Sequence, residues 1–301
     1  MADHPGLVGF RISATNSAGL DWTRLDETWA LAAELEAFEA GWMSDHLSDA
    51  SRERGGPAFE AFTMAAALAR RVPGKWVGIA VASATFRHPA VVAKSATVLD
   101  NVTGGRFILG IGAGWHTGEH DAYGIPLPPP RQRFDRLESA VGVISALFSP
   151  AAAAPEGVTR EDRFWPLRGA TNQPGPARAG GPPIWLGVGG PRGIGLAARH
   201  ASGWPMPGNR PGDVAHFAEQ RDRLRAALEA AGRDPDGFSF AAQLSAVPTP
   251  QGLRSARAEG LAFLRAGATH VIVGLPASAA PDGLRRVATE VAEPLLAAAG
   301  A

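Results

Sequence analysis

The 301-residue chain contains no cysteine, which excludes disulfide bonds, zinc–thiolate sites and thiol nucleophiles together. It has no surplus of either charge, since 29 Lys and Arg residues balance 29 Asp and Glu residues. A nucleic-acid-binding surface is therefore not expected, and any anion site must be local. The chain also lacks an apolar run of the roughly 18 residues that a membrane helix requires, and it lacks a basic-then-apolar leader. We expect a cytoplasmic protein with neither a nucleic-acid nor a membrane partner.

What the chain does contain is a regular alternation of short apolar runs with amphipathic stretches, in a sequence that is 45% hydrophobic. The runs that we predict to be strands are 8–12, 42–44, 76–82, 107–111, 184–187, 203–205, 238–242 and 270–273. The stretches that we predict to be helices are 25–40, 60–71, 90–102, 133–148, 192–200, 214–231, 253–265 and 284–298. Eight strand–helix units in this length predict an α/β fold of the (β/α)8 TIM-barrel type, formed by a single domain over residues 1–301. A doubly wound open sheet is the alternative, but its glycine-rich phosphate loop would follow the first strand, whereas the glycines here follow the fourth and fifth.

One segment departs from the repeating pattern. Residues 149–181 are rich in Ala, Pro and Gly and are too many for an ordinary connection between a helix and a strand. We interpret this segment as an insertion near the barrel mouth, with the character of a flexible lid. Substrate specificity is expected in this segment and in the loop 48–59, because specificity in barrels resides in variable loops.

The fourth predicted strand runs into three glycines at every second position, Gly110, Gly112 and Gly114. On a strand of period 2 these glycines share one face, which then carries no side chains. A sheet built only for packing would fill that face. The pattern indicates that a flat or bulky ligand lies against the backbone there.

In a barrel the chemistry is expected at the carboxyl ends of the strands. Four neighbouring loops at those ends hold nearly all the unusual residues, namely 45–46, 83–88, 112–120 and 189–193. The last of these, Gly-Gly-Pro-Arg-Gly, begins a predicted helix, where free N–H groups, the helix dipole and Arg192 favour a phosphate. A tight strand-to-helix turn without a ligand is the alternative interpretation of this short motif.

The polar residues of these loops also have more than one interpretation. Asp45 could cap a helix or bind backbone amides, but the imidazole of His46 beside it is a side chain that suits a proton donor. The spacing of His116, Glu119 and His120 invites a metal site, yet Gly118 lies between them and the HExxH pattern is absent. We predict no metal site. We interpret Trp115, His116, Glu119 and His120 as substrate contacts; ordinary loop residues, and packing at the barrel rim for Trp115, are the alternatives.

Several segments together resemble a known family. They are GWMSDHL, ATFRHPAVVAKSATVLDNVTGGRFILGIGAGW, EHDAYGIPLPPPRQRFDRLESAVGVISALF and PPIWLGVGGPRGIGLAARHASGWP, about two thirds of the chain. In this order they are similar to the bacterial luciferase-like flavin and deazaflavin oxidoreductases. The SDH, FRHP and GGRFILGIGAGW segments are typical of the branch that uses the deazaflavin coenzyme F420. The resemblance implies the barrel already predicted, and a homodimer, which is common among such relatives.

Carried over to matching positions, the resemblance implies that Asp45 contacts the deazaflavin ring and that His46 lies close to it as a proton donor. It also implies a bulge in the third strand with a non-prolyl cis peptide at Ala80-Val81, behind the ring. Ser83 would reach the ring or its tail, and the turn after the fifth strand would hold the phosphate. The cofactor-binding residues implied in this way are Asp45, Ala80, Val81, Ser83, Gly112, Ala113, Gly114, Gly189, Gly190, Arg192 and Gly193.

The departures from the family pattern limit the function. Trp115 stands where the sugar-phosphate dehydrogenases of this branch carry a catalytic Glu, so we do not expect that activity. Ser202 replaces an Asp, and Arg11 followed by 13–16 replaces the usual end of the first strand. The leading hypothesis is an F420-dependent oxidoreductase that transfers a hydride between the coenzyme and a small organic molecule. The alternatives are an FMN-dependent monooxygenase that uses oxygen, a non-catalytic cofactor-binding paralogue and a metal-dependent barrel hydrolase.

Overall fold

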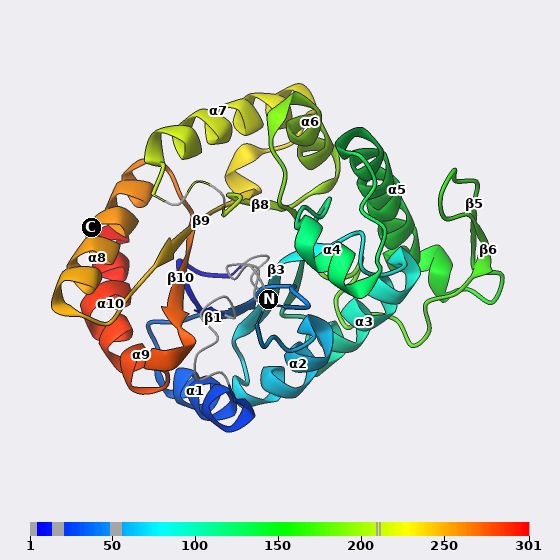
Figure 1. Cartoon of the computed structure of the whole chain (residues 1–301). Helices are drawn as coiled ribbons and strands as arrows, with labels where there is room; N and C mark the ends of the chain where they lie inside the picture. The colour runs from blue at the N-terminus through cyan, green and yellow to red at the C-terminus, as the bar shows by residue number, and fades with distance from the viewer. Residues whose placement is uncertain (1–4, 14–20, 49–55, 209, 211, 301) are drawn as a thin grey trace.

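The computed structural model describes residues 5–13, 21–48, 56–208, 210 and 212–300. Within these residues, eight parallel strands close into a barrel in the order β1-β10-β9-β8-β7-β4-β3-β2 (Figure 1). The strands are β1 (Val8–Ser13), β2 (Ala40–Met43), β3 (Trp76–Ser83), β4 (Phe107–Gly112), β7 (Ile184–Leu186), β8 (Gly203–Pro205), β9 (Ser239–Ser245) and β10 (His270–Pro276). The (β/α)8 fold predicted from the alternation is confirmed, and the open-sheet alternative is wrong because the eight strands close on themselves, with β1 pairing with both the second and the last strand of the barrel.

Helices cover the outside of the barrel (Figure 1). They are α1 (Trp22–Glu34), α2 (Ala61–Leu68), α3 (Pro89–Val102), α5 (Pro130–Phe148), α6 (Gly190–His200), α7 (Val214–Ala230), α8 (Pro250–Arg265), α9 (Asp282–Val287) and α10 (Glu293–Ala299). A π-helical turn, Ala288–Ala292, joins the last two, where the sequence predicts one continuous helix. The described part of the chain has no helix long and apolar enough to cross a membrane.

Local signals account for where the helices begin. His88 caps α3 by accepting the N–H of Ala90, and Pro89 occupies the first turn, where its missing N–H costs nothing. Thr249 and Pro250 repeat this arrangement at α8. One further helix, α4 (Thr117–Tyr123), lies after β4, where the sequence analysis expects a loop. Its seven residues are too few for hydrophobic periodicity to reveal it.

Side-chain alternation along the strands divides the core into two regions. Val8, Phe10 and Ile12 of β1 belong to the large cluster between the barrel and its helices, where Phe10 contacts Trp29 of α1 edge-on with ring centroids 4.9 Å apart. The intervening positions point into the barrel. Inside the barrel a second cluster contains Trp42 and Trp185, whose ring centroids are also 4.9 Å apart. These two indoles fill the barrel interior.

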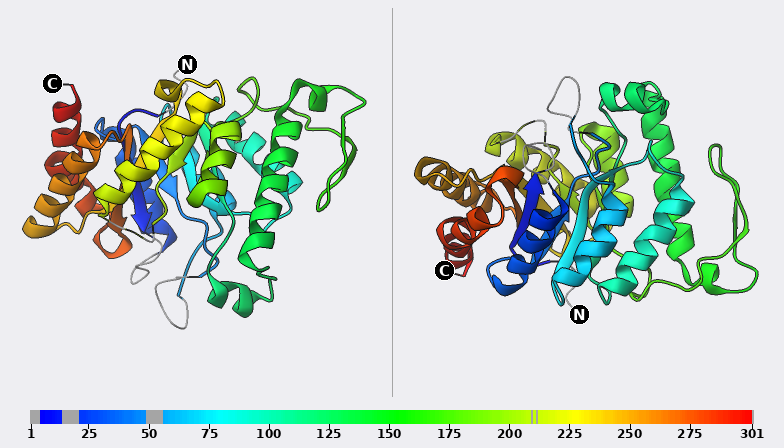
Figure 2. Two further views of the ribbon diagram at one scale, coloured as in Figure 1. Left: turned by 90° about the horizontal axis from the view of Figure 1, so that it is seen from above. Right: turned by 60° about the horizontal axis from the view of Figure 1, so that its bottom comes forward.

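The insertion 149–181 does not cover the barrel mouth. It forms a two-stranded antiparallel hairpin, β5 (Val158–Arg160) and β6 (Leu167–Ala170), which extends to the side beyond α3 and α5 (Figures 1 and 2). Asn172 ties its return segment down, donating to Thr97 Oγ1 at 2.9 Å and to the Leu147 carbonyl at 3.0 Å. The insertion is present as predicted, but the lid interpretation is wrong. No residue of the insertion is part of the cavity lining described below.

Candidate functional site

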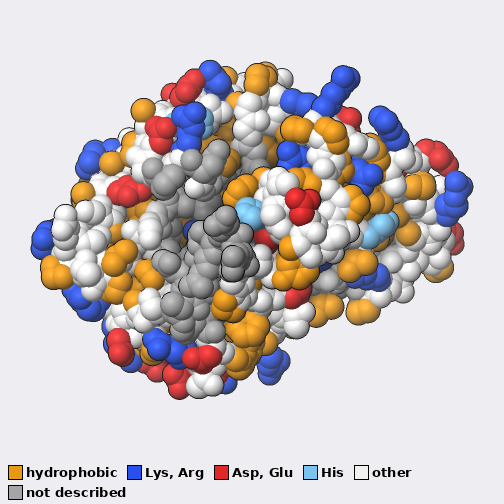
Figure 3. All heavy atoms as spheres, in the orientation of Figure 1, with side chains coloured by type: hydrophobic (Ala, Val, Ile, Leu, Met, Phe, Trp, Pro, Cys, Tyr) orange, Lys and Arg blue, Asp and Glu red, His pale blue; other side chains and the backbone are white. Residues whose placement is uncertain are grey.

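The carboxyl ends of the strands surround a cavity of about 560 Å³. Its lining comes from β1, β3, β4, β8 and β9, from α4 and from the segments that follow β2, β3, β4, β7 and β8. This volume lies within the range of about 300–1,000 Å³ typical of small-molecule sites. Figure 3 shows a histidine side chain near the centre of this face, next to hydrophobic side chains. The location agrees with the prediction that the chemistry lies at the strand ends.

Asp45 lies in this lining and is fully engaged by the protein. Its carboxylate accepts the N–H of Ser83 at 2.9 Å and two N–H groups of Arg87, at 2.7 and 2.9 Å. Arg87 also pairs with Glu60, the N-cap of α2, and stacks over the ring of Phe62. Burial alone would lower the pKa of the Arg87 guanidinium, but Asp45 and Glu60 outweigh it and raise that pKa. Asp45 therefore binds a backbone amide, which was one of the two roles without a ligand considered for it, and Arg87 compensates its negative charge.

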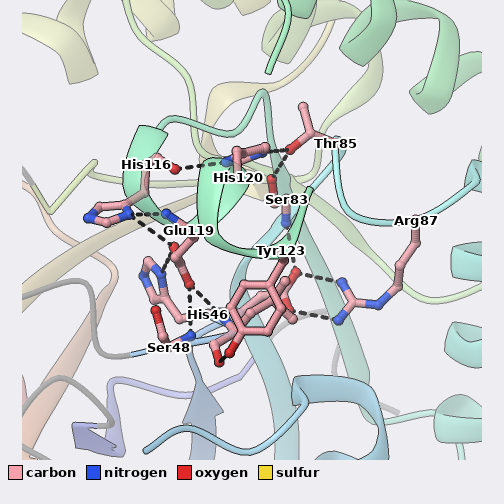
Figure 4. A network of polar contacts seen from close by, with 11 residues as sticks. His46, Ser48, Ser83, Thr85, Arg87, His116, Glu119, His120 and Tyr123 are labelled. Carbon is pink, nitrogen blue, oxygen red and sulfur yellow. Dashed lines mark hydrogen bonds and ion pairs between the residues drawn. The ribbon is translucent and has the colours of Figure 1, made fainter. Parts of the chain in front are cut away.

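His46 is paired with Glu119, a residue 73 positions away in the sequence (Figure 4). His46 Nδ1 lies 2.9 Å from Glu119 Oε2, and Oε1 of the same carboxylate accepts the N–H groups of Leu47 at 2.7 Å and Ser48 at 3.1 Å. Since a carboxylate can only accept, Nδ1 of His46 carries the proton. Nε2 is then the ring nitrogen available to the cavity.

Glu119 is buried, with 1% of its surface exposed. Burial would raise the pKa of its carboxyl group, but the hydrogen bond and charge of His46 and the two backbone amides outweigh it and lower that pKa. The residue is therefore an anion at neutral pH. Both carboxylate oxygens of Glu119 accept hydrogen bonds from the protein, and its expected contact with substrate stays a prediction. Its contact with His46 could not be seen in the sequence.

The two other histidines of this region hold α4 and its neighbours in place. His116 caps α4 by accepting the Glu119 N–H at 3.0 Å. His120 is bound at both ring nitrogens, Nδ1 to the His116 carbonyl at 2.8 Å and Nε2 to Thr85 Oγ1 at 2.7 Å (Figure 4). Thr85 in turn contacts Ser83. No group of three or more metal-ligating side chains is gathered anywhere in the described ranges.

The third strand carries the predicted irregularity. Its register with β4 shifts between Ile79 and Ala82, and the Ala80-Val81 peptide bond is cis. The bulge and the cis bond implied by the resemblance are thus confirmed at the matched pair. The bulge brings Val81 against β4 and β7, because a Cβ at Gly112 would lie 3.0 Å from its side chain. The role of this pair behind a cofactor ring stays a prediction.

The glycine-rich wall differs in part from the expected bare face. A Cβ at Gly110 would lie 2.1 Å from the Ile79 carbonyl oxygen, so this glycine is required by the neighbouring strand and not by a ligand. β4 ends at Gly112, and Gly114 has φ +78, outside the strand geometry. Gly112, Ala113 and Gly114 do line the cavity. The backbone there presents a wall without large side chains, which begins at Gly112 and not at Gly110 as the sequence pattern suggests.

The glycine turn after β7 lies apart from the cavity lining. Gly189 caps α6, Gly190 has φ +69, and a Cβ on either would meet open space. These positions and Gly193 form the first turn of α6, with N–H groups that have no helical acceptor. Arg192 is exposed and pairs with Asp135 at 2.7 Å and with Glu138 at 2.9 Å on α5. A phosphate at this turn would share Arg192 with two carboxylates.

Trp115 lies at the cavity rim with 66% of its surface exposed. Its ring meets His46 and His116 edge-on, with centroids 6.2 and 4.9 Å away. The packing interpretation of Trp115 is therefore wrong, because a packed residue would be buried. An aromatic wall at the entrance is the interpretation that remains.

Two features of the site were not expected from the sequence. Arg87 belongs to the FRHP segment, but no local pattern assigns it a role, because its pairing with Asp45 depends on the fold. Arg11 and Gln243 also line the cavity, and the guanidinium lies 2.7 Å from the amide oxygen. An arginine between Phe10 and Ile12 in a short apolar strand was the available signal, since alternation places it inside a barrel.

Comparison with known proteins identifies the family. The family model described as luciferase-like monooxygenase matches residues 7–298, nearly the whole chain. The chain belongs to this family. The resemblance drawn from the sequence segments is thereby confirmed.

Relatives within the luciferase-like family include F420-dependent enzymes. The phthiodiolone/phenolphthiodiolone dimycocerosates ketoreductase of Mycobacterium kansasii is 35% identical over 223 residues, covering 68% of this chain and 58% of the relative. An F420-dependent glucose-6-phosphate dehydrogenase of Microbacterium testaceum (strain StLB037) is 33% identical over 177 residues, covering 58% of this chain and 50% of the relative. The chain thus spans less than two thirds of the length of these relatives.

Solved structures share the fold. An F420-dependent secondary alcohol dehydrogenase in complex with an F420–acetone adduct superimposes with a TM-score of 0.79 at 18% identity, covering 98% of this chain and 99% of the other. The EDTA monooxygenase of Chelativorans sp. BNC1 gives a TM-score of 0.73 at 16% identity, covering 98% and 94%. At these identities the likeness concerns the barrel fold alone.

Proposed function

We propose that the protein is an F420-dependent oxidoreductase that transfers a hydride between the deazaflavin and a small organic substrate. The observation that carries the proposal is the cavity itself. It combines the His46–Glu119 pair with a wall of backbone at Gly112 to Gly114 and with the bulge at Ala80-Val81. A proton-carrying side chain beside a wall without large side chains suits hydride transfer to or from a stacked ring.

The residues present fit a deazaflavin. A Cβ at Gly112 would lie 3.0 Å from the Val81 side chain, and one at Gly114 would lie 2.6 and 2.7 Å from the Thr85 and Ser83 oxygens, so neighbouring protein groups favour glycine at both positions. With these two glycines and Ala113, the cavity wall carries no side chain larger than a methyl group, which leaves room for a planar ring. The first turn of α6, with Gly189, Gly190 and Gly193, would hold the phosphate through its free N–H groups.

The chemistry that the reduced coenzyme supplies when bound is a two-electron hydride. The chain's own contribution is a proton at His46 Nε2. Glu119 holds Nδ1 protonated and keeps the ring in one orientation, so Nε2 can give a proton to an oxygen of the substrate or take one from it. Asp45, fixed by Arg87, would contact the ring edge, and Trp115 would cover the entrance.

The reaction class follows from relatives that carry the name ketoreductase or sugar-phosphate dehydrogenase, both of which interconvert a carbonyl and a hydroxyl group. We propose the same class here, on a different substrate. Trp115 occupies the position of the catalytic Glu in the sugar-phosphate branch, so glucose 6-phosphate is not the expected substrate.

Parallel titrations of the protein with F420 and with FMN, by isothermal calorimetry, test the cofactor. We expect F420 to bind with micromolar or lower Kd and FMN at least tenfold more weakly. Quenching of tryptophan fluorescence should accompany binding and should decrease in Trp115→Phe. Preference for FMN with oxygen-dependent turnover would overturn the proposal in favour of a monooxygenase. F420 binding without hydride transfer to any of a panel of aldehydes and ketones would indicate a non-catalytic paralogue.

A further inference from the structure

Arg11 carries a positive charge inside the barrel. In the described part of the chain, the side chain that accepts a hydrogen bond from its guanidinium is the uncharged Gln243. Its Nη1 donates to Gln243 Oε1 at 2.7 Å, across the gap between β1 and β9. Gln243 is oriented in turn, because its Nε2 donates to the Met206 carbonyl at 2.6 Å. The amide oxygen is thereby directed at Arg11, and the guanidinium is held in a fixed position on the cavity wall.

The charge of Arg11 is not compensated by any carboxylate among the described residues. Its Nε is buried and has no hydrogen-bond partner in that part of the chain. Burial lowers the pKa of Arg11 to about 10, with no opposing contribution from an acidic group. Arg11 as a whole is half-buried, and a cation withdrawn from water in this way without an anion is destabilising, so natural proteins seldom retain one without a use.

The other charges of the cavity are already paired. Asp45 is bound by Arg87, and Glu119 is bound by His46. Arg11 is the sole Lys or Arg among the described residues that line the cavity. Pro205 and Pro207 form the adjacent wall and have no N–H to offer. Among these side chains, Arg11 is thus the permanently charged cation that a negatively charged group in the cavity would meet without a competing carboxylate.

We infer that Arg11 and Gln243 form the binding site for a carboxylate of the substrate, an inference that rests on the proposed function. One guanidinium balances a monoanion, whereas a phosphate dianion would require a second cation that the described lining lacks. Both ends of such a substrate have a place in one cavity, because its lining contains His46, which follows β2, together with Arg11 of β1 and Gln243 of β9. The expected substrate is a small hydroxy or oxo acid, with its reacting oxygen at His46 and its carboxylate at Arg11.

Anion binding by the ligand-free protein tests the site without F420 and without turnover. The probes are benzoate, its neutral isostere benzamide, and inorganic phosphate, each at constant ionic strength. We expect a saturable rise in Tm with benzoate and none with benzamide, since only the carboxylate satisfies Arg11. Equal protection by benzamide, or stronger protection by phosphate, would overturn the carboxylate assignment.

Arg11→Met should lower the affinity for benzoate about 10- to 100-fold, the range for a hydrogen bond to a charged group. It should leave the ligand-free Tm unchanged or raise it by a few °C, because an uncompensated buried charge is removed. Arg11→Lys should retain part of the affinity. Arg71→Met is the matched control: this exposed arginine pairs with Asp26 on the outer helices, and its loss should leave benzoate protection intact.

Gln243→Glu gives a second test, because it places a carboxylate on Arg11 from within the protein. Benzoate protection should disappear while the circular dichroism spectrum is retained. A marked fall in ligand-free Tm in Arg11→Met, with benzoate protection retained, would show that Arg11 is only structural.

Two controls separate this inference from the proposed function. The Kd for F420 should change less than threefold in Arg11→Met, and benzoate should still bind to the F420 complex. A tenfold loss of F420 affinity, with competition between F420 and benzoate, would instead assign Arg11 to the coenzyme and overturn the inference. If F420 fails to bind at all but benzoate protection depends on Arg11, the cofactor proposal fails and the carboxylate site stands.

Discussion

Glu119 determines what the imidazole of His46 can do. A carboxylate next to Nδ1 can only accept the hydrogen bond of the Nδ1–H group, and its charge stabilises the protonated ring. An amide at the same place can also donate a hydrogen bond. Because Glu119 also binds the N–H groups of Leu47 and Ser48, it fixes the backbone that carries His46 as well as the ring. Position, tautomer and charge of one side chain thus depend on one buried residue.

Replacement of Glu119 by Gln should reverse the tautomer of His46. The amide oxygen can keep the backbone contacts of Leu47 and Ser48, so the amide NH2 faces Nδ1, which must then accept. We expect a loss of hydride-transfer rate of about 100-fold or more, as for an active-site histidine held in the wrong tautomer. Nitrogen NMR of labelled His46 should show Nδ1 protonated in the wild type and unprotonated in Glu119→Gln.

Tyr123→Phe is the control for this change. Tyr123 lies on the same helix and donates to the Leu47 carbonyl at 2.9 Å, so its loss perturbs the same loop without affecting the charge. A similar fall in rate in both variants, with the His46 tautomer unchanged, would contradict the assigned role of Glu119.

At the scale of elements, short helices and hairpins position residues that the barrel strands cannot reach. α4 begins at the His116 cap and ends at Gly124, which has φ +65. This single helix brings Glu119 to His46 and His120 to Thr85. The β5–β6 hairpin is organised differently, around Asp162, which accepts from Ser139 of α5 and from the N–H groups of Phe164 and Trp165.

The hairpin should loosen in acid. Burial opposes the charge of Asp162, but hydrogen bonds from Ser139, Trp165, Phe164 and Arg160 outweigh it and lower its pKa from 3.8 to about 2. Because the folded-state pKa is the lower one, this stabilisation is complete above pH 3.8 and is lost as the pH falls toward 2. Amide exchange of residues 158–170 should therefore accelerate between pH 4.5 and pH 2.5, beyond the change in intrinsic rate.

Asp162→Asn should show the accelerated exchange at both pH values and cost about 1 kcal/mol, after allowance for solvent screening. Asp236→Asn, at an exposed pair with Arg225, should leave the hairpin unchanged. Equal exchange in the wild type and in Asp162→Asn at pH 4.5 would show that the hairpin is held by packing alone.

At the scale of the whole molecule, the barrel is closed around large aromatic rings that require small neighbours. A Cβ at Gly78 of β3 would lie 2.4 Å from the ring of Trp42, and one at Gly203 of β8 would lie 2.4 Å from the ring of Trp185. Trp42 also donates to His270 of β10 at 2.9 Å. Through Trp42 and Trp185, the interior packing connects β2 with β3 and β10, and β7 with β8, so a change at one of these rings affects several strands.

Gly78→Ala should destabilise the protein by about 1–3 kcal/mol, because the added methyl group forces Trp42 from its position. Urea denaturation followed by fluorescence and circular dichroism measures the change. Gly237→Ala is the control, since a Cβ there meets nothing within 4 Å and the residue has no positive φ. Its effect should stay within about 0.5 kcal/mol. Equal stability of the Gly78→Ala and wild-type proteins would contradict this expectation and would mean that the Trp42 ring can shift to accept the methyl group without loss of stability.

Much of the molecule could be predicted from the sequence for a physical reason. Strand and helix periodicity, proline at helix starts and glycine in tight turns are local, so eight strand–helix units could be counted and the barrel inferred. The cavity loops could be predicted in the same way, because they follow the predicted strands, whereas the bulge of β3 was implied by the resemblance to the family. Boundaries were less accurate: β9 and β10 extend to Ser245 and Pro276, beyond the predicted ends, because strand pairing and not residue type sets their length.

Only the tertiary structure decided which side chains meet. Glu119 lies 73 residues from His46, and Gln243 lies 232 residues from Arg11. No local pattern encodes such separations; they result from barrel closure, which brings the ends of distant strands to one rim. The same closure placed the insertion 149–181 outside the barrel mouth. The sequence by itself determined the barrel, its family and the loops that carry the chemistry, and the folded chain determined the partners of each charge within them.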